Sequence, residues 1–288
     1  MIAAALLLAL AAPAQHLNYQ GVDRAYRVHR PANLPHNRRA PLVVVLHGGF
    51  GTGAQAEKSY GWDAVADRYG FIVAYPDGIG RSWHAGPQCC AESMKRDLDD
   101  VGFLNTVIRT IESSENVDPK RIVVTGMSNG AMMSYRMACE SPLPLLGIAP
   151  VAGTTLVPCS KPQQLSILEI HGTADRNIPF NGGLGQGPGR VTTPPIPDLI
   201  AQWRSREHCD TPATRTAGTV TTTSAQCAHQ TRVELIAVSG AGHQWPGSLP
   251  PSAAWVALAK RLDINGLDQP SNALNATQTI AAFFGLTR

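Results

Sequence analysis

The chain has 288 residues, of which 43% are hydrophobic and 16% are charged, and its formal net charge is +3. That size allows one large domain with a substantial core, and the composition is typical of a globular protein. The small charge and the lack of like-charge runs argue against nucleic acid or an anionic membrane surface as a partner.

The N-terminal segment predicts export. Residues 1–10 are apolar, and Ala12-Pro13-Ala14 has the small residues of a cleavage site, although the segment carries no Lys or Arg. We therefore predict a signal peptide over 1–14, a single domain over 15–288, and a secreted protein, extracellular or periplasmic. The apolar run is too short to span a bilayer. The alternative is a misassigned start codon that truncates a longer leader, which would also mean export.

Strand and helix patterns alternate along the rest of the chain. Expected strands are apolar or β-branched runs, at 17–29 (one or two strands), 41–46, 71–74, 121–125, 146–151, 167–170 and 233–238. Expected helices have periodic apolar positions, at 62–69, from Asp100 as N-cap to 111, at 131–138, and from Asn275 as N-cap to 284. This alternation indicates an α/β fold, with a mostly parallel sheet covered by helices on both faces. Ligands bind such sheets at the carboxyl ends of the strands, and the Gly/Pro-rich stretch 180–197 is predicted to be a long loop at that rim.

The most informative motif is Gly126-Met127-Ser128-Asn129-Gly130, which lies between a predicted strand and a predicted helix. A G-x-S-x-G in that context is typical of a nucleophile elbow, which exposes its serine at the N-terminus of a helix. The alternative is an ordinary Gly-Ser turn.

A serine nucleophile needs a base and an orienting acid, which follow it along the chain in that order. His243 comes directly after the last strand, in a glycine-rich loop, and is the predicted base. Asp175 is the only carboxylate in the loop after strand 167–170 and is the predicted acid, with Asp198 and Asp210 as fallbacks. His171 is expected to form hydrogen bonds within its own turn and to have no direct role.

Two N–H donors should stabilise the oxyanion. We predict Asn129, which follows the serine, and Gly49 in the turn after strand 41–46, with Phe50 as the second choice and His47 as a brace. Trp83, Trp245 and Phe50 are candidate substrate-binding residues, and the alternative for the two indoles is ordinary packing. No metal-binding or nucleotide-binding motif is present in the sequence, so we predict no metal and no cofactor.

Six cysteines predict disulfides in an exported chain. Cys209 and Cys227 are expected to close a Thr/Ala-rich loop. A Cys89–Cys90 bond would require a strained ring, so we expect one of these two residues to reach Cys139 and the other Cys159. Buried free thiols are the alternative.

Several stretches together resemble the secreted polyhydroxybutyrate depolymerase and feruloyl esterase family, which is related to carbohydrate esterase family 1. They span residues 42–284 and include Leu46-His47-Gly48-Gly49-Phe50-Gly51, Tyr75-Pro76-Asp77-Gly78, Cys89-Cys90, Asp99-Asp100-Val101-Gly102-Phe103, Gly126 to Met133, Ala149-Pro150-Val151-Ala152-Gly153, Ile170-His171-Gly172-Thr173-Ala174-Asp175 and Gly242-His243-Gln244-Trp245-Pro246-Gly247. The resemblance implies an α/β-hydrolase fold with Ser128, Asp175 and His243 as the triad. Many depolymerase-like members carry a cysteine and polar residues where this chain has Gly49-Phe50, so soluble esters or oligomers are expected in place of an insoluble polymer.

The sequence thus predicts a serine carboxylic-ester hydrolase acting through an acyl-enzyme. Expected substrates are hydroxycinnamoyl or acetyl esters of plant polysaccharide, or short 3-hydroxybutyrate esters. The alternatives are an acyltransferase on the same scaffold and a non-catalytic exported binding protein. The sequence makes no prediction of oligomeric state.

Overall fold

A ten-stranded sheet forms the centre of the computed structural model, which describes residues 13–35, 37–160, 162–253, 256–257, 261 and 268–287. The strand order is β1-β2-β4-β3-β5-β6-β7-β12-β11-β10. The strands of this sheet are β1 (Gln15–Tyr19), β2 (Val22–His29), β3 (Ala40–Leu46), β4 (Ile72–Pro76), β5 (Val117–Met127), β6 (Gly147–Val151), β7 (Ser166–Gly172), β10 (Ala213–Ala217), β11 (Val220–Gln226) and β12 (Arg232–Val238). The helices are α1 (Gly53–Tyr60), α2 (Trp62–Tyr69), α3 (Ala91–Lys95), α4 (Asp100–Ser114), α5 (Asn129–Glu140), α6 (Ile196–Arg206) and α8 (Ala276–Phe283), with short 3₁₀ turns at Ile79–Arg81 and Ala228–Gln230.

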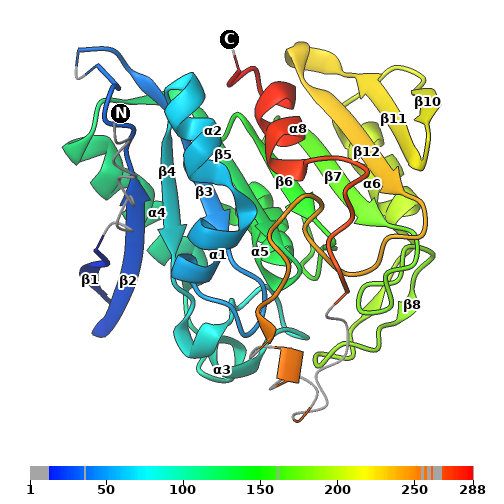
Figure 1. Cartoon of the computed structure of the whole chain (residues 1–288), viewed down its shortest axis with the longest axis horizontal. Helices are drawn as coiled ribbons and strands as arrows, with labels where there is room; N and C mark the ends of the chain where they lie inside the picture. The colour runs from blue at the N-terminus through cyan, green and yellow to red at the C-terminus, as the bar shows by residue number, and fades with distance from the viewer. Residues whose placement is uncertain are drawn as a thin grey trace, which may run out of the picture.

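The six central strands, β4 to β12 in the sheet order, pair in parallel, and an antiparallel pair of strands extends each edge. Helices α1, α2 and α8 cover one face, and α4, α5 and α6 cover the other (Figure 1). The predicted fold class, a mostly parallel sheet between two helical layers, is confirmed. The chain passes from β3 to β4 and then crosses to β5 on the other side of β3, so a topological switch point lies between β3 and β5.

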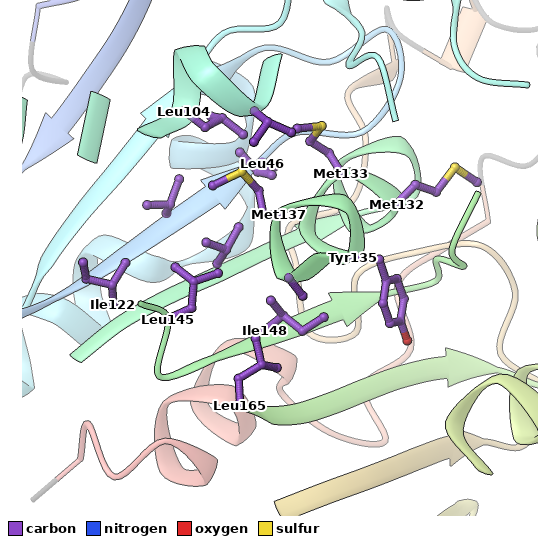
Figure 2. Packing of buried hydrophobic residues seen from close by; sticks show 14 of the residues in the cluster. Leu46, Leu104, Ile122, Met132, Met133, Tyr135, Met137, Leu145, Ile148 and Leu165 are labelled. Atoms are coloured by element: carbon purple, nitrogen blue, oxygen red, sulfur yellow. The ribbon is translucent and has the colours of Figure 1, made fainter. Parts of the chain in front are cut away.

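Burial on both faces explains why the central strands are apolar without alternation. Every residue of β3, β4 and β6 is buried. Residues of β3 point alternately to the two helical layers: Leu46 packs with the α5 side chains Met133 and Met137 (Figure 2), while Val45 packs on the opposite face. The helix that follows Ser128 therefore packs directly on the buried central strands.

The segment between Cys209 and Cys227, expected as a loop, is an edge hairpin of the sheet. Its strands β10 and β11 pair through threonines, with Oγ1 atoms 3.1 Å apart for Thr214–Thr223 and 3.0 Å apart for Thr216–Thr221. The hairpin is largely exposed, so it lacks the apolar alternation that reveals a half-buried strand. The stretch 180–197 likewise contains a small hairpin, of β8 (Gly183–Leu184) and β9 (Thr192–Thr193), within the predicted loop.

The N-cap of α4 is Asp99 and not Asp100 as predicted. The Asp99 carboxylate accepts from the Gly102 N–H at 2.8 Å. Asp100 is instead fully buried, where Arg24 Nη2 donates to Oδ1 at 2.7 Å and the His84 N–H donates to Oδ2 at 2.7 Å. Asp99 and Asp100 have the same N-cap propensity, so the sequence alone could not show which of the two is the cap. The predicted cap Asn275 is confirmed, since its Oδ1 accepts from the Gln278 N–H at 2.9 Å.

All six cysteines form disulfides, and the predicted Cys209–Cys227 bond is present. The other prediction is wrong: Cys89 joins Cys90, and Cys139 joins Cys159, with Cα atoms 5.1 Å apart. Cys89 Sγ lies 3.6 Å from Asn129 Nδ2, at the start of α5. Cys139 is ten residues further along that helix, about 15 Å away, which is beyond the reach of a disulfide.

The predicted signal peptide falls almost wholly on residues 1–12, which lie outside the described residues. Within the described ranges, no helix combines the length and apolarity needed to cross a membrane.

Candidate active site

Ser128 lies at the turn between β5 and α5. Its backbone has φ 56° and ψ −118°, a positive φ that residues with side chains seldom adopt. The flanking glycines are required by packing, because a Cβ on Gly126 would lie 2.7 Å from the Leu46 oxygen and one on Gly130 would collide with the Leu46 and His47 carbonyls. The elbow therefore holds a half-buried serine at the N-terminus of a helix, where N–H groups face outward.

The predicted acid, Asp175, and the predicted base, His243, are in direct contact. Asp175 Oδ2 lies 2.8 Å from His243 Nδ1, and both side chains are buried. Asp175 Oδ1 accepts from the N–H groups of Asn177 (2.8 Å) and Ile178 (2.9 Å), so the carboxylate cannot rotate freely. When Asp175 Oδ2 accepts a hydrogen bond from Nδ1–H, a neutral imidazole presents its lone pair at Nε2.

Backbone hydrogen bonds that continue the sheet bring the three loops to one edge. Ser128 N–H donates to the Val151 carbonyl at 2.9 Å, and Ala174 N–H donates to the Ala241 carbonyl at 2.9 Å. Among the described residues, Ser128 Oγ makes no hydrogen bond with His243. Such bonds are often long in free enzymes and tighten when substrate binds. The structure thus joins the predicted acid to the predicted base, and Ser128 lies at the same sheet edge.

The charge balance around Asp175 favours its ionised form. Burial would raise the pKa of Asp175, but the charges and hydrogen bonds of His243 and His171 outweigh it and hold that pKa well below its usual range. An ionised acid beside His243 stabilises the imidazolium that forms when the base takes a proton.

Gly49 and Asn129, the two predicted oxyanion donors, lie close together. A Cβ placed on Gly49 would lie 4.0 Å from Asn129 Cβ, and in the described chain neither N–H donates to another backbone group. The second choice, Phe50, is ruled out as a donor in this conformation, because its N–H donates to the Arg81 carbonyl at 2.8 Å. The Phe50 side chain is 39% exposed, so it can contact a ligand at the rim.

The predicted bracing role of His47 agrees with its contacts. His47 Nε2 accepts from the Gly78 N–H at 3.0 Å, which leaves Nδ1–H to donate to the Gly48 carbonyl at 2.8 Å. Burial lowers the pKa of His47, in agreement with a neutral ring. A neutral imidazole thus fixes the turn that carries Gly49.

The Asn129 side chain clamps the neighbouring segment. Its Oδ1 accepts from the Trp83 N–H at 2.7 Å, and its Nδ2 donates to the Trp83 carbonyl at 2.9 Å. The clamp fixes the orientation of the Asn129 peptide.

The two indoles predicted to bind substrate are core residues, which favours the packing alternative. Trp83 is fully buried and its Nε1 donates to the His47 carbonyl at 3.0 Å. Trp245 stacks on Tyr60 at 4.4 Å between ring centroids, and its Nε1 donates to Thr277 Oγ1 at 3.1 Å. Proximity along the chain to the predicted site does not reveal which way a large ring points.

Sequence reasoning missed two supporting carboxylates. Asp268 Oδ2 accepts from the backbone N–H of His243 at 2.7 Å, and a Cβ on Gly242 would collide with this carboxylate. Glu169 lies behind Asp175, with its Oε1 2.8 Å from His171 Nδ1. Glu169 had a detectable signal, since it is a charge inside an apolar strand, whereas Asp268 had none.

His171 forms the predicted bond within its own turn, to the Ile178 carbonyl at 2.8 Å. The fallback acids Asp198 and Asp210 are both exposed. In the part of the chain that the structure describes, no group of three or more His, Cys, Asp or Glu residues could hold a metal ion.

A mostly parallel sheet between helical layers, with a serine at a strand–helix turn, defines an α/β-hydrolase fold. The fold agrees with that of an acetyl xylan esterase from Aspergillus awamori, which superposes with a TM-score of 0.63 at 16% identity, covering 96% of this chain and 100% of the other.

Sequence comparisons point the same way. Residues 98–185 match the phospholipase/carboxylesterase family, a span that includes Ser128 and Asp175. A relative named as an esterase, NocK, from Nocardia uniformis subsp. tsuyamanensis, is 34% identical over 259 residues, which cover 80% of this chain and 73% of the relative.

Two further relatives are longer than the matched region. Feruloyl esterase B of Piromyces equi is 31% identical, covering 74% of this chain and 41% of the relative. Poly(3-hydroxyalkanoate) depolymerase C of Paucimonas lemoignei is 34% identical, covering 43% of this chain and 30% of the relative. The chain therefore spans less than half the length of these two proteins. The chain belongs to the same esterase family as the Nocardia relative, within the α/β-hydrolases, and it is a serine esterase.

Proposed function

We propose that this esterase is a secreted enzyme that works through an acyl-enzyme, with Ser128 as nucleophile, His243 as base and Asp175 as acid. The observation that carries the proposal is the 2.8 Å contact between His243 Nδ1 and Asp175 Oδ2 at the sheet edge where Ser128 is presented. This contact sets the tautomer that a serine nucleophile requires.

In the first half of the reaction, Ser128 Oγ attacks the ester carbonyl carbon while His243 Nε2 takes the hydroxyl proton. The N–H groups of Asn129 and Gly49 stabilise the oxyanion. The tetrahedral intermediate then collapses, the C–O bond to the alcohol breaks, and His243 delivers its proton to the departing alcohol oxygen. In the second half, water loses a proton to His243 and attacks the acyl-enzyme, which releases the acid and restores the Ser128 hydroxyl.

We propose that the substrates are soluble esters or oligomers: hydroxycinnamoyl or acetyl esters of plant polysaccharide, or short 3-hydroxybutyrate esters. The names of the relatives support ester chemistry of these kinds, and the exposed Phe50 side chain at the rim offers apolar contact to an acyl group. Turnover of methyl ferulate, acetylated xylan and a hydroxybutyrate trimer, measured side by side, would identify the preferred acyl group. Failure to hydrolyse any of the three would contradict the proposed substrate class.

Replacing Ser128 with Ala should lower kcat on p-nitrophenyl acetate by several orders of magnitude and abolish labelling by a fluorophosphonate probe. A matched control is Ser134→Ala, on the same helix, where the hydroxyl donates only to the Ala131 carbonyl. This control should keep both activity and labelling. Near wild-type turnover in Ser128→Ala would refute the proposed nucleophile.

A further inference from the structure

Directly behind Asp175 lies a pair of ionisable side chains that the proposed mechanism does not use. Glu169 and His171 are both fully buried, and Glu169 Oε1 lies 2.8 Å from His171 Nδ1. Removing a charged pair from water costs several kcal/mol per ion, which packed apolar side chains would avoid. A buried pair in contact with a proposed catalytic residue therefore calls for an explanation beyond packing.

His171 contacts the acid itself. Its Nε2 lies 2.8 Å from the Ile178 carbonyl and 3.4 Å from Asp175 Oδ2, the same oxygen that faces His243. Both neighbours of Nε2 are acceptors, so Nε2 carries a proton. Asp175 Oδ2 is thus held between two imidazole rings.

Glu169 connects this arrangement to the helix that carries the serine. Its Oε2 accepts from the Tyr135 hydroxyl at 3.0 Å, and its Oε1 also accepts from the Gly153 N–H at 3.3 Å. Tyr135 lies on α5 and extends from it toward the strands (Figure 2). A continuous set of hydrogen bonds therefore runs from α5 through Glu169 and His171 to Asp175.

The donors around Glu169 favour an ionised carboxylate and a doubly protonated His171. Burial would lower the pKa of His171, but Asp175 and Glu169 on its two sides raise that pKa to about 10. Burial raises the pKa of Glu169 above its usual value, and the contacts of His171 and Tyr135 offset only part of this rise. The pair therefore retains its shared proton through neutral pH.

We propose that Glu169 and His171 are positioning residues of ester hydrolysis: His171 holds Asp175 with Oδ2 toward His243, and Glu169 ties His171 to the helix that carries Ser128. This inference rests on the proposed function, because it requires Asp175 to be the acid of the triad. Neither residue needs to touch the substrate.

The charged and titratable groups around the pair are few. On β7 and its following loop they are Glu169, His171 and Asp175; α5 contributes Tyr135, and the loop after β12 contributes His243. Asp268 meets His243 through its backbone N–H. Removing His171 deletes a positive charge beside Asp175, so the carboxylate stabilises the imidazolium form of His243 more strongly.

Three glutamine variants test the proposal on the full chain with p-nitrophenyl acetate. Glu169→Gln and His171→Gln should each lower kcat by about 10- to 100-fold per fluorophosphonate-titrated site, while KM changes little, because the acid is misplaced and substrate contacts are not. Glu207→Gln is the matched control. Glu207 is also a buried carboxylate with a raised pKa, but its side chain contacts Thr231 at 3.4 Å, and in the described part of the chain it forms no hydrogen bond with Glu169, His171 or Asp175. Its kcat should stay at the wild-type value.

The pH profile of kcat/KM distinguishes a specific effect of His171 on Asp175 from a general loss of packing in the variant. In His171→Gln the acid limb of kcat/KM should move to higher pH by about half a unit or more, because the positive charge beside Asp175 is lost. A neutral His171 that only fills space would leave the acid limb in place. If a variant fails to fold, ¹⁵N NMR of the wild-type protein still decides the charge state, since both ring nitrogens of His171 should be protonated at neutral pH. A neutral His171, an unmoved acid limb, or wild-type kcat in Glu169→Gln would overturn the inference.

The two proposals fail in different ways. Full activity in Ser128→Ala would remove the proposed function and this inference together. An inactive Ser128→Ala alongside wild-type kcat in Glu169→Gln would remove this inference alone.

Discussion

Asp175 accepts hydrogen bonds from the Asn177 and Ile178 N–H groups and from His243, and each type of contact has its own consequence. The backbone donors orient the carboxylate, and the imidazole contact selects the tautomer of the base. The loop 171–177 contains no other carboxylate, so position alone makes Asp175 the predicted acid.

Asp175→Asn should lower kcat by about four orders of magnitude, because the amide donates to Nδ1 and forces the proton onto Nε2, where it blocks attack. Steady-state kinetics on p-nitrophenyl acetate measures this. The control is Asp198→Asn, the fallback acid, which is exposed in the first turn of α6. Its kcat should be unchanged, and the reverse pattern would assign the acid to Asp198.

Among the larger elements, the β10–β11 hairpin shows how a polar segment joins the sheet. It is held on one side by backbone pairing with β12 and on the other by Arg204 of α6, whose Nη2 donates to the Thr223 carbonyl at 2.9 Å. The Cys209–Cys227 bond closes the base of the hairpin. Because this edge lies several strands from β5, it stabilises the fold without shaping the serine turn.

Replacing both Cys209 and Cys227 with Ser should lower the free energy of unfolding by about 3 kcal/mol, since the unfolded chain regains the entropy of an 18-residue loop. Denaturant unfolding checks the stability, and kinetics on p-nitrophenyl acetate at low temperature should show unchanged kcat. A loss of kcat in the folded variant would show that the hairpin shapes the active site.

Two buried ion pairs lie on the same face of the sheet, one on each side of the serine turn. Arg24 and Asp100 support the segment that Asn129 clamps, since the Asp100 carboxylate also accepts from the His84 N–H. Glu169 and His171 support the acid loop. Both pairs thus bury charges, at a cost in desolvation, at places where loops from distant strands are fixed relative to one another.

The raised pKa of His171 makes a prediction about stability against pH. Its folded-state pKa, about 10, lies above the ordinary histidine pKa of 6.5, so the contribution to stability is full below pH 6.5 and is lost as pH rises toward 10. The wild-type protein should therefore lose stability over this range at up to about 1.4 kcal/mol per pH unit relative to the Glu169→Gln/His171→Gln double variant. Denaturant unfolding at pH 6.5 and pH 9.5 measures the difference. Parallel curves for the two proteins would contradict a charged His171.

Much of the fold and the proposed triad could be predicted because their signals are local. Apolar runs indicate β3, β6 and β7, and the limits of α2 match the predicted 62–69. The glycines around Ser128 indicate the tight turn between β5 and α5. The order of nucleophile, acid and base then selects candidates from the loops that follow the strands.

The features that escaped prediction are relations through space between distant segments. The partner of Cys139 depends on how far α5 runs from Cys89, and the burial of Trp83 depends on which carbonyl its ring reaches. Glu169 becomes meaningful only when α5 brings Tyr135 beside it. Local patterns along the chain thus indicated the central strands, several of the helices and the loops that follow the strands, because propensity and burial act on neighbouring residues. Packing alone chose the partners of each polar side chain, because hydrogen bonds and disulfides depend on distances that arise after the elements have assembled.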